Sequence, residues 1–309
     1  MTRNRSAVSS TGSPAGLRFR KARDHVVEVF LLLAALVAVF TTIAIVVVLV
    51  MESLPFFRVV SLKDFLTDTM WIPLFAEPRY GILPLVAGTL VTTFVALAVA
   101  VPCGTIIAIY LSEFAPFRLR ETIKPALELL GAVPTVVYGY FALMIVTPML
   151  QKIIPGLPGF NMLSAGLVIG IMIIPYIASV SEDAMRSVPN FMREGSYAMG
   201  ATRFQTATRV VVPGALSGIA AAYILGISRA VGETMVVAIA AGLQPNLTWD
   251  PTQPAATITA FIVQVSLGDL PHGSIGYQSI FAAGLVLMLM TLVFNIAGFS
   301  LTRRFRQAY

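Results

Sequence analysis

The sequence has little charge. Asp, Glu, Lys and Arg make up only 12% of its 309 residues, against about 25% in soluble domains. The hydrophobic fraction is 57%, and two soluble domains of this total length could not keep so much apolar surface away from water. This composition excludes a soluble globular protein and indicates that lipid is the solvent for much of the chain.

Cysteine and histidine are also scarce. The chain has one cysteine, Cys103, and two histidines, His25 and His272. One thiol cannot form a disulfide framework or a Cys-rich metal site. With so few partners a structural zinc site or a Cys/His nucleophile is not expected either. We therefore expect no metal site and no cofactor in this chain.

Long uncharged runs are abundant. Five runs of 23 to 33 residues contain no Asp, Glu, Lys or Arg, namely 29–51, 80–112, 129–151, 153–181 and 270–302. A sixth stretch, 210–249, is interrupted only by Arg229 and Glu233. About 20 apolar residues suffice for a helix to cross the hydrocarbon core. The runs predict an all-α integral membrane protein with six transmembrane helices. The first run exceeds the roughly 7–15 residues of a signal-peptide core, so we expect an uncleaved anchor.

Basic residues are distributed asymmetrically between the connections. Sixteen of the 21 Lys and Arg fall on one side in this arrangement, at 3, 5, 18, 20, 21, 23, 118, 120, 124, 186, 193, 203, 209, 303, 304 and 306. Four fall on the other side, at 58, 63, 79 and 152. Because basic residues favour the cytoplasmic side, both termini of this multi-pass protein are predicted to be cytoplasmic. The net charge of +6 then reflects topology, and no nucleic-acid partner is expected.

The same runs divide the chain into regions. Residues 1–25, rich in Ser, Thr, Gly and Arg, are expected to form a disordered basic cytoplasmic tail close to the lipid headgroups. Residues 26–305 form the predicted six-helix transmembrane domain. Within it, 52–79 and 243–278 are expected to be ordered extracytoplasmic segments, and 182–213 is a cytoplasmic loop.

The loop 182–213 has a helix–turn–helix pattern. Pro189 suits the start of a first helix and Gly200 suits a left-handed cap at its end. Thr202 and Gln205 form a capping-box pattern that opens a second helix, which Pro213 is expected to stop. The loop also carries the apolar residues Phe191, Met192, Tyr197 and Phe204. They either form a docking surface or rest on the chain's own helix ends.

Arg229 and Glu233 stand alone among the apolar residues of 210–249. An ionised arginine in mid-membrane costs about 2.5–3.5 kcal/mol on insertion scales, so it must be paired or line a polar cavity. A four-residue spacing places both side chains on one helix face, where Glu233 would hold Arg229 in place. Arginine's planar fork suits an oxyanion. The two residues are therefore either part of a substrate pathway or a structural ion pair.

Two motifs carry a family resemblance. Residues 229–235 read Arg-Ala-Val-Gly-Glu-Thr-Met, and in the loop Glu194, Gly200 and Pro213 keep the spacing of the Glu-Ala-Ala coupling loop, with Gly-Ser in place of Ala-Ala. The chain resembles the permeases of phosphate-specific ATP-binding-cassette importers of the PstC type. The resemblance implies the type I (MetI-like) importer architecture, a pathway role for Arg229 and Glu233, and contact of the loop with an ATPase.

The resemblance also implies partners and a place in the cell. These are a second related permease, two cytoplasmic ATP-binding subunits and an extracytoplasmic phosphate-binding protein, in the plasma membrane of a prokaryote, with inorganic phosphate as substrate. The chain has no Gly-Lys pair, hence no Walker A loop, so we expect a transport subunit that is not itself an enzyme. Alternatives are the sister PstA-type permease, a permease for another small oxyanion, an ion-coupled secondary carrier, and a membrane receptor or scaffold.

Overall fold

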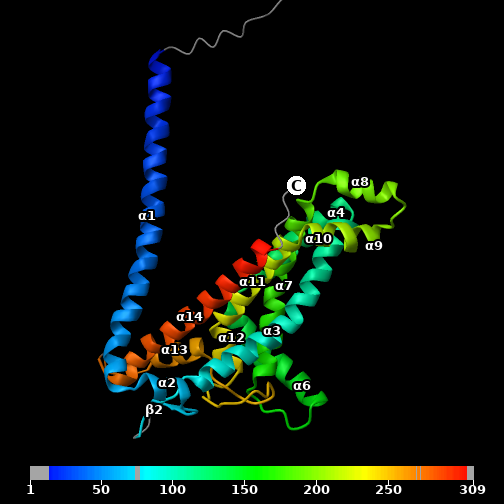
Figure 1. The fold of residues 1–309 in the computed structure, drawn as a ribbon. Coiled ribbons are helices and arrows are strands. Elements are labelled where there is room, and N and C mark those ends of the chain that lie inside the picture. The colour runs from blue at the N-terminus through cyan, green and yellow to red at the C-terminus, as the bar shows by residue number, and fades with distance from the viewer. Residues whose placement is uncertain (1–13, 74–76, 269, 272, 305–309) are drawn as a thin grey trace, which may run out of the picture. The chain divides into compact units, whose positions relative to one another are not determined.

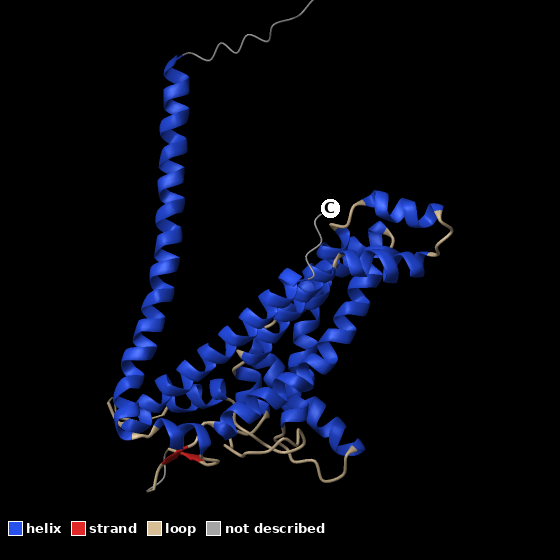
Figure 2. Cartoon of the chain, in the orientation of Figure 1, coloured by secondary structure: helices blue, strands red, loops and turns tan. Residues whose placement is uncertain are grey.

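A computed structural model describes residues 14–73, 77–268, 270–271 and 273–304. The described residues are mostly helical, with two short strands (Figure 2), and the expectation of an all-α protein is confirmed. The chain divides into two units, residues 1–51 and 52–309.

Helix α1, Pro14–Val59, forms the whole of the described part of the first unit. The expectation of a disordered tail over 1–25 is wrong from Pro14 onward, and residues 1–13 lie outside the described residues. Residues 15–23 consist mainly of Ala, Leu, Lys and Arg, which favour a helix. The helix therefore extends upstream of the apolar run. Proline is also well tolerated at a first helical position.

Within residues 52–309 the membrane-length helices lie side by side (Figure 1). They are α3, Leu83–Ile109, with the π-helical turn η1, Tyr110–Phe114; α5, Thr135–Phe141, with η2, Ala142–Val146, and α6, Thr147–Ile153; α7, Met162–Arg186; and α14, Ile275–Arg304. With α1, five helices of the described chain are long and apolar enough to cross a membrane. A sixth is present if the bent pair 203–214 and 216–231 counts as one span.

Helix α7 lies at the centre of this bundle. Its start is capped by Asn161, whose side chain accepts a hydrogen bond from the amide of Ser164 at 2.7 Å. Its glycines allow close approach to α3: a Cβ on Gly166 would lie 2.7 Å from Val95, and one on Gly170 would lie 2.7 Å from the carbonyl oxygen of Ala96. Small residues at this spacing thus let the two helices meet closely.

The loop 182–213 and its neighbours gather at one end of the bundle (Figure 1). They are α4, Phe117–Ala132; α8, Asn190–Ala198; α9, Arg203–Thr206; the π-helical turn η3, Ala207–Val211; and α10, Val212–Gly214. Helix α4 ends before Pro134, which lacks an N–H and sits at the N-cap of α5. The third span consequently begins at Thr135, six residues after the start of the uncharged run.

The segments 52–79 and 243–278 contribute to the opposite end. They contain α2, Leu62–Thr67, the antiparallel strands β1, Trp71–Ile72, and β2, Arg79–Tyr80, and α13, Ile258–Ser266. Residues 74–76, 269 and 272 lie outside the described residues. Trp71 and Phe261 are buried edge to face with ring centroids 4.9 Å apart, and Phe65 joins them. Edge-to-face aromatic pairs of this kind stabilise a small core.

The fifth span is broken in the middle of the stretch 210–249, close to its two charged residues. Helix α11, Leu216–Val231, ends there, and α12, Met235–Ala240, begins after three residues. Helix α11 is bent by 72° from the helices that precede it. The expectation that Arg229 and Glu233 share a face of one continuous helix is therefore wrong.

Candidate functional site

Helix α8 and the turn after it follow the sequence pattern. Pro189 is the N-cap of α8, and Gly200 has the positive φ of +82°. The amide of Gly200 donates to the carbonyl of Tyr197 at 2.9 Å, and the amide of Ala201 donates to that of Ser196 at 3.2 Å. This pair of bonds is a Schellman cap. The predicted role of Gly200 in ending the helix is confirmed.

The second helix opens as predicted but does not end as predicted. Thr202 and Gln205 form both bonds of a capping box. Pro213 was expected to stop this helix, but the chain remains helical through Gly214 and breaks at Ala215. The turn η3 ends at Val211, two residues before Pro213, and a π-helical bulge can accommodate a local change in the backbone hydrogen-bond ladder.

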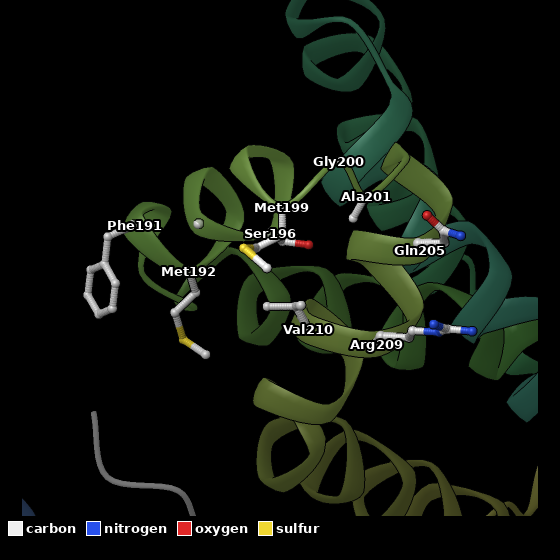
Figure 3. Close-up of a pocket in the computed structure, with 10 residues that line it drawn as sticks. Phe191, Met192, Ser196, Met199, Gly200, Ala201, Gln205, Arg209 and Val210 are labelled. Carbon is white, nitrogen blue, oxygen red and sulfur yellow. The ribbon is translucent and has the colours of Figure 1, made fainter.

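Exposed apolar side chains surround a groove between these two helices. The groove has a volume of about 750 Å³ and is lined by Phe191, Met192, Gly195, Ser196, Met199, Gly200, Ala201, Gln205, Arg209 and Val210 (Figure 3). Phe191 is 68% exposed and Met199 88%. They do not rest on the chain's own helix ends, whereas Met192 is half-buried against the bundle. An exposed apolar groove of this kind is typical of a docking surface.

Glu194 belongs to α8 but does not line the groove. It is exposed, and its side chain forms no hydrogen bond or ion pair with any other residue that the structure describes. Its neighbour Arg193 instead points into the protein. Arg193 donates to both carboxylate oxygens of Glu113, from Nη2 at 3.0 Å and from Nε at 3.3 Å, and also to the carbonyls of Val188 and Met185. This bidentate pair joins α8 to the turn η1 at the end of α3.

A second group of charges joins α4 to α7. Glu182 is fully buried, and its carboxylate lies 2.7 Å from Lys124 Nζ, 3.6 Å from Arg186 Nη1 and 3.8 Å from Arg120 Nε. Burial lowers the pKa of Lys124, but hydrogen bonds to Asp183 and Glu182 outweigh it, so that the pKa lies above its usual value. Three cations around one buried carboxylate satisfy its charge.

The break between α11 and α12 separates Arg229 from Glu233. Glu233 is only 7% exposed, and its Oε1 accepts hydrogen bonds from the amides of Met235 at 3.1 Å and Val236 at 3.3 Å. Its backbone carbonyl accepts a bond from Thr259 Oγ1 at 2.7 Å. The carboxylate thus caps the start of α12, where the helix dipole favours an anion. The expectation that Glu233 holds Arg229 in place is wrong.

Arg229 lies in the last turn of α11, where the helix dipole favours a cation. Its guanidinium forms no hydrogen bond or ion pair with any described residue, and Nε is buried without a partner. It lies instead over the ring of Tyr176 of α7, with Cζ 4.7 Å from the ring centroid, in the range of a cation–π contact. No carboxylate of the residues that the structure describes occupies the donors of this arginine.

Sequence reasoning missed Tyr176 and two acids: Glu113, which holds α8, and Glu182, which joins α7 to α4. Glu113 and Glu182 had a usable signal, because each directly follows an uncharged run on the predicted cytoplasmic side. Tyr176 had none, since an aromatic residue in an apolar helix is ordinarily part of the core. The described residues contain no group of three His, Cys, Asp or Glu that could hold a metal ion.

Comparison with known proteins identifies the architecture. The family described as "Binding-protein-dependent transport system inner membrane component" matches residues 100–308, more than half of the chain. The chain belongs to this family. It is therefore a multi-pass inner-membrane transport subunit and not an enzyme; in transporters of this kind ATP is hydrolysed by a separate subunit and substrate is delivered by a binding protein.

Curated relatives place the chain among the phosphate-system permeases. It is 36% identical to the probable ABC transporter permease protein YqgH of Bacillus subtilis over 84% of both chains. It is 34% identical to the phosphate transport system permease protein PstC of Mesorhizobium japonicum over 78% of both chains, and 34% identical to that of Xylella fastidiosa over 96% of both chains. The resemblance to PstC-type permeases is thereby confirmed.

Solved structures confirm the importer fold. A permease chain of a bacterial ABC transporter involved in the import of the acidic polysaccharide alginate matches with a TM-score of 0.64 and 16% identity, covering 94% of this chain and 99% of that one. A chain of the MetNI methionine ABC transporter in an inward-facing conformation matches with a TM-score of 0.54 and 19% identity, covering 74% and 95%. At these identities the match concerns the fold alone.

Proposed function

We propose that this chain is the membrane-spanning permease subunit of an ATP-driven importer of inorganic phosphate. The observation that carries the proposal is Arg229, a guanidinium within a predicted membrane span whose donors meet no carboxylate among the described residues. Such a group favours a tetrahedral oxyanion, which it can bind through two parallel charge-assisted hydrogen bonds. The names of the PstC relatives support phosphate as that oxyanion.

Movement would come from the loop 182–213. The groove between α8 and α9 and the exposed Phe191 and Met199 suit a site for a cytoplasmic ATP-binding subunit. The ion pair of Arg193 with Glu113 would transmit a displacement of α8 to α3. Arg229 would then be exposed alternately to the two sides of the membrane. Glu194, Gly200 and Pro213 would belong to this coupling loop: Gly200 lines the groove, Glu194 is exposed on α8 outside the groove, and Pro213 lies in α10.

The proposed assembly has four kinds of subunit. A second related permease would face this chain, two ATP-binding subunits would bind at the loop end, and a phosphate-binding protein would dock at the opposite end. This arrangement places both termini in the cytoplasm, in agreement with the asymmetry of the basic residues. The relation of the family to binding-protein-dependent transport supports it.

The decisive experiment replaces Arg229. In the reconstituted complex, Arg229→Gln should leave all subunits assembled and abolish uptake of labelled phosphate, because the amide lacks the charge and the fork that bind the anion. Arg118→Gln makes the same change at an exposed position near the loop end and should keep uptake. Loss of assembly with normal uptake per remaining complex would instead identify a structural arginine.

Competition and energy supply test the rest of the proposal. Unlabelled phosphate should compete with labelled phosphate, whereas sulfate and phosphonate should not. Preferential competition by sulfate or phosphonate would show that the substrate is another oxyanion. Uptake that persists without ATP and stops when the proton gradient is removed would show that the protein is an ion-coupled carrier.

A further inference from the structure

Arg229 needs a support other than Glu233. A guanidinium on a long flexible side chain binds an anion well only if it is held in place before the anion arrives. Glu233 does not hold it, because its Oε1 accepts from the amides of Met235 and Val236 and its carboxylate forms no ion pair with Arg229. Among the described residues, the guanidinium instead lies over the ring of Tyr176, with Cζ 4.7 Å from the ring centroid.

An aromatic ring supports an arginine in a different way from a carboxylate. The ring attracts the cation through its face and leaves the N–H donors at the guanidinium edge unused. A carboxylate would neutralise the charge and occupy those donors. A ring under Arg229 therefore fixes its position while keeping its charge and its hydrogen-bonding edge available to an oxyanion.

Tyr176 is itself fixed from the other side. Its hydroxyl donates to the carbonyl of Gly131 at 3.1 Å, near the end of α4. A Cβ on Gly131 would lie only 3.2 Å from that hydroxyl, so glycine permits the close approach of α4 to the ring. The carbonyl before it, Leu130, accepts a bond from Tyr138 at 2.7 Å. The ring of Tyr176 is thus held between the end of α4 and Arg229.

We propose that Tyr176 is a positioning residue for the anion site, holding Arg229 through its ring in the place where an ion pair would otherwise be expected. This inference rests on the proposed function, since it assigns the support of the same arginine. The ring, and not the hydroxyl, is the essential part, because it is the ring that contacts the guanidinium. Tyr176 does not itself bind phosphate in this proposal.

The test compares replacements of Tyr176 in the complete reconstituted complex. Tyr176→Leu removes the ring and should lower the maximal phosphate uptake per assembled complex by about tenfold, the scale of a desolvated cation–π contact. ATP hydrolysis stimulated by the phosphate-loaded binding protein should stay within about twofold of the original rate, because the loop surface is unchanged. Tyr176→Phe keeps the ring and should restore uptake.

Tyr138→Leu is the matched control. It removes a tyrosine that donates to the neighbouring carbonyl of α4 and forms no hydrogen bond or cation–π contact with Arg229. It should reduce the amount of assembled complex without lowering uptake per complex. If Tyr176→Leu is not recovered as a complex, Tyr176→Met, which fills space without a ring, replaces it.

Three outcomes separate the two proposals. Unchanged uptake per complex in Tyr176→Leu or Tyr176→Met, while Arg229→Gln abolishes uptake, overturns the role of Tyr176 alone. If Tyr176→Phe loses as much uptake per complex as Tyr176→Leu, the effect belongs to the hydroxyl, and the proposed role of the ring is also overturned. Normal uptake in Arg229→Gln overturns the proposed function of the arginine, and the role of Tyr176 with it.

Discussion

Replacing Glu113 by glutamine should weaken the attachment of α8 to the end of α3. Glu113 accepts two hydrogen bonds from Arg193, and both side chains are largely buried, at 5% and 14% exposure. Glutamine has nearly the same shape but offers one neutral acceptor in place of a charged pair. Arg193 then stays buried without a counter-ion.

The size of the effect follows from these contacts. Removing one partner of a buried ion pair costs about 3–5 kcal/mol, and each hydrogen bond to a charged group contributes about 1.5–3 kcal/mol. Arg193 keeps the carbonyls of Met185 and Val188 as acceptors, and the introduced glutamine keeps one bond. We therefore expect a loss of about 2–3 kcal/mol, which lowers the equilibrium constant for the attached position of α8 by roughly 30- to 150-fold.

The assay is the number of phosphate ions transported per ATP hydrolysed by the reconstituted complex. The ratio should fall in Glu113→Gln while ATP hydrolysis continues, and trypsin should cleave faster in the loop, at Arg203 and Arg209. Arg79→Gln is the control, because it breaks an ion pair with Asp68 in which Arg79 is 51% exposed, and such pairs contribute below about 1 kcal/mol. An unchanged ratio together with unchanged cleavage would refute a mechanical role for the pair.

Two further predictions concern the same end of the molecule. Gly200→Ala should lower transport per ATP because alanine is strained by about 1 kcal/mol at φ +82°, and Gly200→Glu should do so more strongly. Gly159→Ala is the control, because Gly159 lies outside the loop, has no positive φ and leaves open space around a new Cβ. It should be neutral, and equal effects at both glycines would contradict this reasoning. The pKa of Lys124 is higher in the folded protein than its usual value. The stability that charged Lys124 contributes to the fold is therefore fully present below its unfolded pKa of about 10.4. It is lost as the pH rises through the higher folded pKa. The thermal stability of Lys124→Gln should therefore differ most from that of the original complex below about pH 10 and converge above it, whereas a constant difference through about pH 11 would argue against the ion pair.

The sequence indicated the membrane helices and the shape of the loop because these depend on local chemistry. Uncharged runs mark spans wherever lipid is the solvent, and the positive φ at Gly200 and the capping box at Thr202 follow from residue types a few positions apart. The prediction of a disordered tail was wrong from Pro14 onward, because it relied on overall composition and not on local helix propensity. Composition suggested disorder there, although the individual residues favour a helix.

The site could be predicted only in part. Arg229 and Glu233 were recognised because lipid tolerates neither as an isolated charge. Their separation depends on bonds that no spacing reveals, above all the capping of α12 by Glu233 and the bond from Thr259, 26 residues further along the chain. The contact of Arg229 with Tyr176 joins residues of two different helices. It becomes visible only when α7 and α11 are packed together.

The π-helical turn η3, Ala207–Val211, lies between the loop helices and α11. A π-helical turn contains about one residue more than a single turn of the α-helix on either side of it. If the same residues wound as a regular α-helix, the two flanking helices would rotate by roughly 90–100° relative to each other, since each residue of an α-helix contributes about 100° at about 3.6 residues per turn. The orientation of Arg229 relative to the groove of α8 and α9 therefore depends on the π-helical winding of this joint, and a residue added or removed without a compensating change of winding would turn the one away from the other by about 100°.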